Sequence, residues 1–323
     1  MRLARRQLLG LGLGMSLPAL PALAAAKALV MCTGRPGGDY MIYGPAWGGL
    51  IHRATGTSIV YRASGGAEAN ILLLDENAAQ LGMTTTAIAH EAWFGGDAWT
   101  AGAHINSFRA LFPAFSSILQ IVSPRSTGIT TLAELASQDI GIGPLGSSAA
   151  AILPALFRSI GVIPRSMVTD DYADQLYGML EGRLTACAFI GAPPVPAIAN
   201  AAMGHKLSLI GFSPAEARQV AHTLPGMIPM IINAGVFPGQ TVAVSSVGTT
   251  NIAICRADLP DALVQNITAV ALANRPPLAA AVPAATSIPS IGSVTGAGIP
   301  FHPGAAAALR AAGIKVEKKN ILP

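Results

Sequence analysis

Residues 28–55 read ALVMCTGRPGGDYMIYGPAWGGLIHRAT, and this stretch decides the fold. Its apolar start predicts a strand, the glycine-rich segment 34–38 predicts a loop, and the spacing of apolar residues from about 43 to 55 predicts a helix. The order strand, loop, helix recurs before residue 95, with further helices expected at 67–74 and 88–94. Such repetition predicts an α/β fold in which helices cover both faces of a parallel sheet.

A second series of strands and helices begins near residue 118. The strand-like stretch 240–255 and two helical patterns nearer the C-terminus follow it, which indicates that the chain returns to the first lobe. We therefore expect two lobes connected by two crossings. The first lobe comprises residues 27–117 and 235–323, the second comprises residues 118–234, and the crossings lie near 115–119 and 232–235.

The first 26 residues have the pattern of an export signal. Arg5 and Arg6 precede an apolar stretch, Pro18 and Pro21 interrupt it, and small residues around Ala24 suit signal peptidase. The Arg-Arg-Gln-Leu-Leu run is typical of the twin-arginine route. The alternative is a membrane anchor, which needs about 20 uninterrupted apolar residues. We expect cleavage near Ala24 and a mature protein in the periplasm.

The composition describes a folded chain without a nucleic-acid partner. Of the 323 residues, 51% are apolar and 11% are charged, so the chain has enough apolar surface to offset the entropy lost on ordering. The formal net charge is +4, but three of the 20 basic residues lie in the leader, and the remaining 17 face 16 acidic residues. No basic cluster marks a surface for nucleic acid.

Neither the cysteines nor the histidines indicate a metal site. Cys32, Cys187 and Cys255 each lie in an apolar, strand-like run and are predicted to be buried thiols. The six histidines lack metal-ligand spacing. The loop 34–38 lacks the GxGxxG spacing, and no GxxxxGK[ST] motif occurs in the chain. We therefore expect no metal, no cofactor and no bound nucleotide.

Three loops lie between a predicted strand and the start of a predicted helix: residues 34–38, 64–66 and 143–148. The first amides of a helix are unpaired and carry partial positive charge, so each loop can hold an anion such as a carboxylate. Arg35 can pair with a carboxylate through both nitrogens, although a surface ion pair is the alternative. Tyr40 can supply a hydroxyl group or a ring wall.

Two other functions remain open at this point. An exported hydrolase would use Ser147 as nucleophile, but Ser147 is not in a GxSxG motif and would need a histidine from elsewhere in the chain. A sensory module would present its bound ligand to a receptor kinase. The residues favour a binding protein that is not an enzyme.

Taken together, the loops resemble the solute receptors of TRAP transporters, TAXI type. The resemblance spans nearly the whole mature chain in order and includes the export signal. Its motifs are Thr33-Gly34-Arg35-Pro36-Gly37-Gly38-Asp39-Tyr40, Ser64-Gly65-Gly66-Ala67-Glu68-Ala69-Asn70, Gly143-Pro144-Leu145-Gly146-Ser147, Ala234-Gly235-Val236-Phe237-Pro238-Gly239 and His302-Pro303-Gly304-Ala305.

The resemblance implies a type II periplasmic binding protein whose two lobes close on a small organic anion of the glutamate or 2-oxoglutarate kind. It implies delivery of that solute to a fused TRAP membrane permease, and we expect the receptor to be a monomer. Carried over by position, the ligand-facing residues are Gly37, Gly38, Tyr40, Ser64, Gly65, Gly146, Ser147, Gly191, Pro193 and Gly239, to which Arg35 is added.

The chain also departs from the family. Where relatives have Gln-Ser-Asp, this chain has Thr84-Thr85-Thr86, and Thr84 and Thr85 are therefore counted with the site. The family's Gly-Ser-Gly-Thr becomes Gly146-Ser147-Ser148-Ala149, and its Tyr-Tyr becomes Tyr40-Met41. Loss of an amide and a carboxylate at the cleft removes groups that recognise an ammonium. We therefore expect a plain carboxylate to be favoured over an amino acid.

Overall fold

A computed structural model describes residues 28–95, 99–282 and 289–322. The predicted export signal, residues 1–26, lies outside them. The described strands join in one 10-stranded sheet. They are β1 (Leu29–Cys32), β2 (Ile59–Arg62), β3 (Leu81–Thr85), β4 (Phe108–Pro124), β5 (Asp139–Gly141), β6 (Ser166–Val168), β7 (Ala186–Gly191), β8 (Leu207–Ile210), β9 (Met227–Ile232) and β10 (Val244–Arg256).

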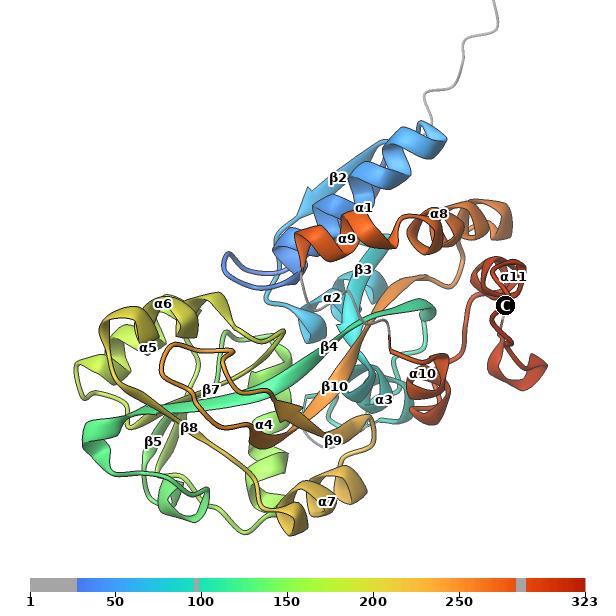
Figure 1. The fold of residues 1–323 in the computed structure, drawn as a ribbon. Coiled ribbons are helices and arrows are strands. Elements are labelled where there is room, and N and C mark those ends of the chain that lie inside the picture. The colour runs from blue at the N-terminus through green and yellow to red at the C-terminus, as the bar shows by residue number, and fades with distance from the viewer. Residues whose placement is uncertain (1–27, 96–98, 283–288, 323) are drawn as a thin grey trace, which may run out of the picture.

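Helices cover this sheet on both sides (Figure 1). They are α1 (Tyr40–Thr55), α2 (Ala67–Asp75), α3 (Thr86–Phe94), α4 (Ser148–Ser159), α5 (Tyr172–Leu180), α6 (Pro196–Gly204), α7 (Pro214–Thr223), α8 (Asp261–Ala273), α9 (Arg275–Ala281), α10 (Ile291–Gly296) and α11 (Pro303–Ala311). Within the described ranges, no helix has the length and apolar character needed to cross a bilayer.

Two long strands connect the halves of the molecule. Strands β1, β2 and β3 pair in parallel in the first half, and β5, β6 and β7 do so in the second. Strands β4 and β10 pair antiparallel with each other and extend into both halves (Figure 1). The β10 strand joins β3, and β4 joins β7. The expected two-lobed α/β fold with two crossings is confirmed.

The sheet differs from the prediction in two respects. It is mixed rather than parallel, because the connecting strands run out to the second half and back. The second crossing runs along β10 rather than near 232–235, because β9 pairs with the first part of β10 and residues after Ile232 turn back before β10 begins. The lobe boundaries stated above stay a prediction.

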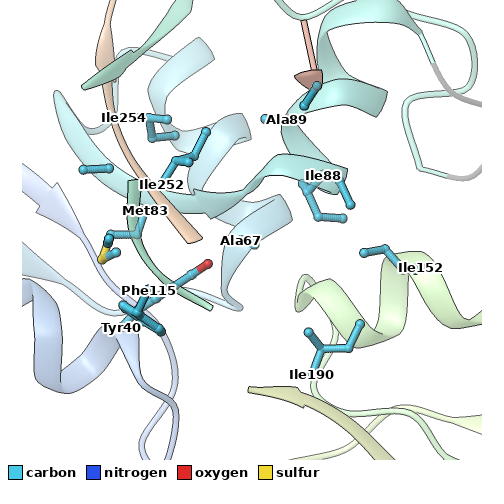
Figure 2. Packing of buried hydrophobic residues seen from close by; sticks show 14 of the residues in the cluster. Tyr40, Ala67, Met83, Ile88, Ala89, Phe115, Ile152, Ile190, Ile252 and Ile254 are labelled. Atoms are coloured by element: carbon cyan, nitrogen blue, oxygen red, sulfur yellow. The ribbon is translucent and has the colours of Figure 1, made fainter. Parts of the chain in front are cut away.

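The core occupies both halves and the crossing strands. Figure 2 shows Tyr40 of α1 beside Phe115 of β4, whose ring centroids lie 6.4 Å apart. Ile152 of α4 and Ile190 of β7 belong to the same buried cluster. A smaller cluster packs α5 and α6 against β4 and β7. All three cysteines are buried and free, as predicted.

Candidate ligand-binding site between the two halves

Loops from both halves meet beside the crossing strands and line a small cavity that is open to solvent on one side. The cavity has a volume of about 50 Å³. It lies at the carboxyl ends of β1, β2, β5 and β7, where open α/β sheets bind their ligands. Its lining residues are Gly34, Arg35, Gly37, Gly38, Asp39, Tyr40, Gly65, Gly66, Ala67, Ser117, Ser147, Ser148, Tyr172, Ile190, Gly191, Val195, Pro196 and Asn251.

The structure brings together seven of the thirteen residues that the sequence singled out: Arg35, Gly37, Gly38, Tyr40, Gly65, Ser147 and Gly191 line the cavity. Gly146 is next to it, where its carbonyl contacts α2. Pro193 lies beside Ala192, which contacts Asp39 across the halves. Residues from the glycine loops of both halves thus line one cavity, as a single binding site formed by these loops would require.

Four of the predicted residues lie away from the cavity wall. The Thr84 hydroxyl donates to the Ala67 carbonyl, and the Thr85 hydroxyl caps α3 by accepting from the N–H of Ile88. The Ser64 hydroxyl donates to the Thr33 carbonyl at 2.8 Å. Gly239 lies in a separate groove between β8, α6 and the β9–β10 loop. The three hydroxyl groups therefore have local structural roles.

A buried hydrogen-bond network forms one wall of the cavity. The Tyr40 hydroxyl donates to Asn251 Oδ1 at 2.7 Å. The Asn251 amide donates in turn to the Ser117 hydroxyl at 2.8 Å and to the Phe115 carbonyl. Since Ser117 and Asn251 belong to β4 and β10, this network attaches the start of α1 to both crossing strands.

The halves touch through backbone atoms at one edge of the cavity. The Gly146 carbonyl accepts from the N–H groups of Glu68 at 3.2 Å and Ala69 at 3.3 Å. A Cβ atom on Gly65 would clash with the Leu145 carbonyl oxygen, so the absence of a side chain permits this approach. The first amides of α2 were expected to hold an anion. That expectation is wrong for these two donors, because the other half occupies them.

The start of α4 keeps donors for a ligand. The Ser147 hydroxyl accepts from the N–H of Ala150 at 3.2 Å and caps the helix. The first-turn N–H groups of Ser148 and Ala149 make no hydrogen bond to another described residue. Ser148 lines the cavity. A carboxylate at this position would receive the free donors and the positive end of the helix dipole.

The charged residues of the cavity have different surroundings. Arg35 forms an ion pair with Asp171 at 3.1 Å, and the two side chains are 45% and 51% exposed, so the sequence alternative of a surface pair is the one observed. Asp39 Oδ2 accepts from the N–H of Ala192 at 2.8 Å. Burial raises the pKa of Asp39 from 3.8 to about 6, against the lowering effect of the Ala192 hydrogen bond.

Four polar lining residues lie outside the predicted loops and were not predicted as site residues: Asp39, Ser117, Tyr172 and Asn251. The Tyr172 ring lies against Gly37 and Gly38 from the opposite half. Burial, and then the negative charge of Asp39, raises the pKa of the Tyr172 hydroxyl. Asp39 was visible as an acidic residue inside the glycine loop motif. The others come from distant segments with no local pattern.

The described lining of the cavity contains no histidine that could act as a base for Ser147. The buried His302 lies at the start of α11, where its Nδ1 accepts from the N–H of Gly304. In the described ranges, no group of three or more histidine, cysteine, aspartate or glutamate side chains could hold a metal ion.

The crossing strands and the cavity between the halves define the two-lobed fold of the periplasmic binding proteins. The chain belongs to the NMT1-like family, which residues 31–313 match. Among solved structures it is similar to MatC from Rhodopseudomonas palustris with bound malate, at a TM-score of 0.55 and 12% identity, over 80% of this chain and 88% of that one.

Two further structures share the fold. The periplasmic binding protein BugD has a TM-score of 0.53 and 12% identity, over 90% of this chain and 98% of its own. The GluR0 ligand-binding core in complex with L-glutamate has a TM-score of 0.50 and 13% identity, over 77% of this chain and 92% of its own. At these identities the likeness shows a shared fold.

Proposed function

We propose that this chain is a periplasmic receptor that captures a small carboxylate of the glutamate or 2-oxoglutarate kind. The observation that supports this most is the cavity itself, which both halves line and beside which the start of α4 leaves backbone donors unpaired. A ligand held there contacts both halves, so it stabilises their closed arrangement relative to an open one. The malate and L-glutamate of two structural neighbours are carboxylates of this size class.

We further propose that the receptor is a monomer of the TAXI type, exported by its leader and serving a fused TRAP permease. The loop motifs and their order along the chain support this assignment. A protein of this kind binds and releases its solute unchanged, so we propose no catalytic residue and no cofactor.

The test is a thermal-unfolding screen of the mature protein against small mono- and dicarboxylates, oxo acids and amino acids. A ligand that binds only the folded protein at 100 times its Kd adds about 2.7 kcal/mol of stability. We expect at least one acid to raise the melting temperature. We also expect neither the unmodified protein nor Ser147→Ala to hydrolyse esters. Failure of every small acid would contradict the receptor function.

Delivery to a permease needs a separate measurement. Vesicles carrying the cognate permease and an ion gradient should accumulate the labelled acid only when the receptor is added. Uptake that does not depend on the receptor, combined with tight binding of the acid, would favour the sensory module instead.

A further inference from the structure

The cavity lining holds one carboxylate whose charge no described side chain compensates. Arg35 and Asp39 are the charged side chains of its described lining. The guanidinium of Arg35 is paired with Asp171 at the exposed rim, so its charge is already compensated. The carboxylate of Asp39 has no cationic partner among the described residues. A ligand in this cavity therefore meets one uncompensated carboxylate.

The surroundings of Asp39 leave one of its oxygens available. Oδ2 accepts from the N–H of Ala192, while Oδ1 makes no hydrogen bond to another described residue. The titratable and charged groups that face Asp39 are Tyr40 on its own helix, Tyr172 on α5 and the Arg35–Asp171 pair at the rim. None of these places a free cation on the carboxylate, so Oδ1 is available to a donor from a ligand.

The start of α4, in the second half, supplies the complementary chemistry. The start of α4 provides backbone N–H groups near Ser148, where a carboxylate is stabilised. An anion without a positive group would gain these donors but would be repelled by the ionised carboxylate of Asp39. An amino acid can satisfy both groups, because its carboxylate and its ammonium are of opposite charge and are attached to the same carbon atom.

We propose that Asp39 is the specificity-determining residue of this site and selects a solute with a cationic nitrogen, an amino acid, whose carboxylate lies at the start of α4. This inference rests on the proposed receptor function. It reverses the sequence expectation of a plain carboxylate. That expectation depended on Thr84 and Thr85, whose hydroxyls bond within the first half and do not line the cavity.

The test is calorimetric titration at pH 7.5 with matched pairs that differ by the amino group: L-glutamate and glutarate, L-aspartate and succinate, L-alanine and propionate. We expect at least one amino acid to bind at least tenfold more tightly than its counterpart. Asp39→Asn keeps the size of the side chain and an oxygen to accept from Ala192, but it removes the charge. This variant should bind the amino acid at least tenfold more weakly. It should also reduce the ratio of affinities between the amino acid and its counterpart without the amino group.

Asp174→Asn is the matched control, because Asp174 is an exposed carboxylate of α5 that does not line the cavity. It should bind like the unmodified protein. If the Asp39 variant unfolds, titration of the unmodified protein with the matched ligand pairs still tests the preference for an amino acid.

Equal or tighter binding of the deaminated acids would overturn the role of Asp39 and leave the receptor function standing. Binding of those acids that strengthens below pH 6 would also overturn it, since Asp39 would then act as a protonated donor to an anion. If no member of any pair binds, the receptor function and this inference fail together.

Discussion

The carboxylate of Asp39 accepts a 2.8 Å hydrogen bond from the backbone N–H of Ala192. Asp39 directly precedes α1 in the first half, and Ala192 directly follows β7 in the second. This bond joins the two halves around the cavity, together with the Arg35–Asp171 ion pair and the hydrogen bonds from the first amides of α2 to the Gly146 carbonyl. The closed arrangement therefore depends on a few polar contacts that can be tested singly.

The ionisation of Asp39 should make stability depend on pH. Burial raises its pKa from 3.8 to about 6, so the folded state binds this proton more tightly than the unfolded state does. The resulting stability is fully present below pH 3.8 and is lost as the pH rises through 6. Between pH 7 and pH 4, the unmodified protein should gain at most about 3 kcal/mol relative to Asp39→Asn. Urea unfolding of both proteins measures this difference, and parallel pH profiles would contradict it.

Replacement of Gly65 should prevent closure without unfolding the chain. A methyl group there would clash with the Leu145 carbonyl of the other half. Gly65→Ala should weaken binding of the best acid more than tenfold in calorimetry, with little change in melting temperature. Gly204→Ala is the control, because a Cβ at that position meets nothing within 4 Å. Unchanged affinity of Gly65→Ala would show that the bound state lacks this contact.

The Tyr40 hydroxyl should contribute to stability through Asn251. Tyr40→Phe leaves the buried Asn251 Oδ1 without its donor, which costs about 1–3 kcal/mol. Tyr177→Phe removes the same atom from a side chain that is 65% exposed and should change stability by less than about 0.5 kcal/mol. Denaturant unfolding of the two variants compares them. Equal small effects would mean that the network carries no net stability.

Ser147 should have two separable roles, as a helix cap and as a wall of the site. Ser147→Ala removes the cap of α4 and should cost about 1 kcal/mol. Ser213→Ala removes the cap of α7, which lies away from the cavity, and should cost a similar amount. Only Ser147→Ala should also reduce the thermal shift caused by the ligand. If the ligand-induced shift in melting temperature fell equally in both variants, Ser147 would have no role in ligand binding.

The parts of the fold that repeat locally could be predicted from the sequence. The stretch 28–55 forms a strand, a glycine loop and a helix as expected, although α1 already begins at Tyr40. The first half of β4 was missed, because Pro113 argues against a central strand and the flanking residues are apolar on both faces. A register shift opposite Pro113 accommodates this proline in the sheet.

The site was only partly predictable for a related reason. Glycine loops such as 34–38 are contiguous and can be recognised in sequence, whereas Tyr172 and Asn251 reach the cavity from distant elements. The sequence also shows where donors are, but not which of them the protein itself occupies. The α2 amides taken by Gly146 illustrate this limit, because the partner carbonyl belongs to the other half.

The crystal structure of the complex with the tightest-binding acid tests the central claim most directly. We predict the ligand between the two halves, with its carboxylate within about 3 Å of the Ser148 N–H and with Asp39 and Tyr172 around its other end. A ligand bound in the groove beside Gly239, or elsewhere on the surface while this cavity stays closed, would contradict the claim.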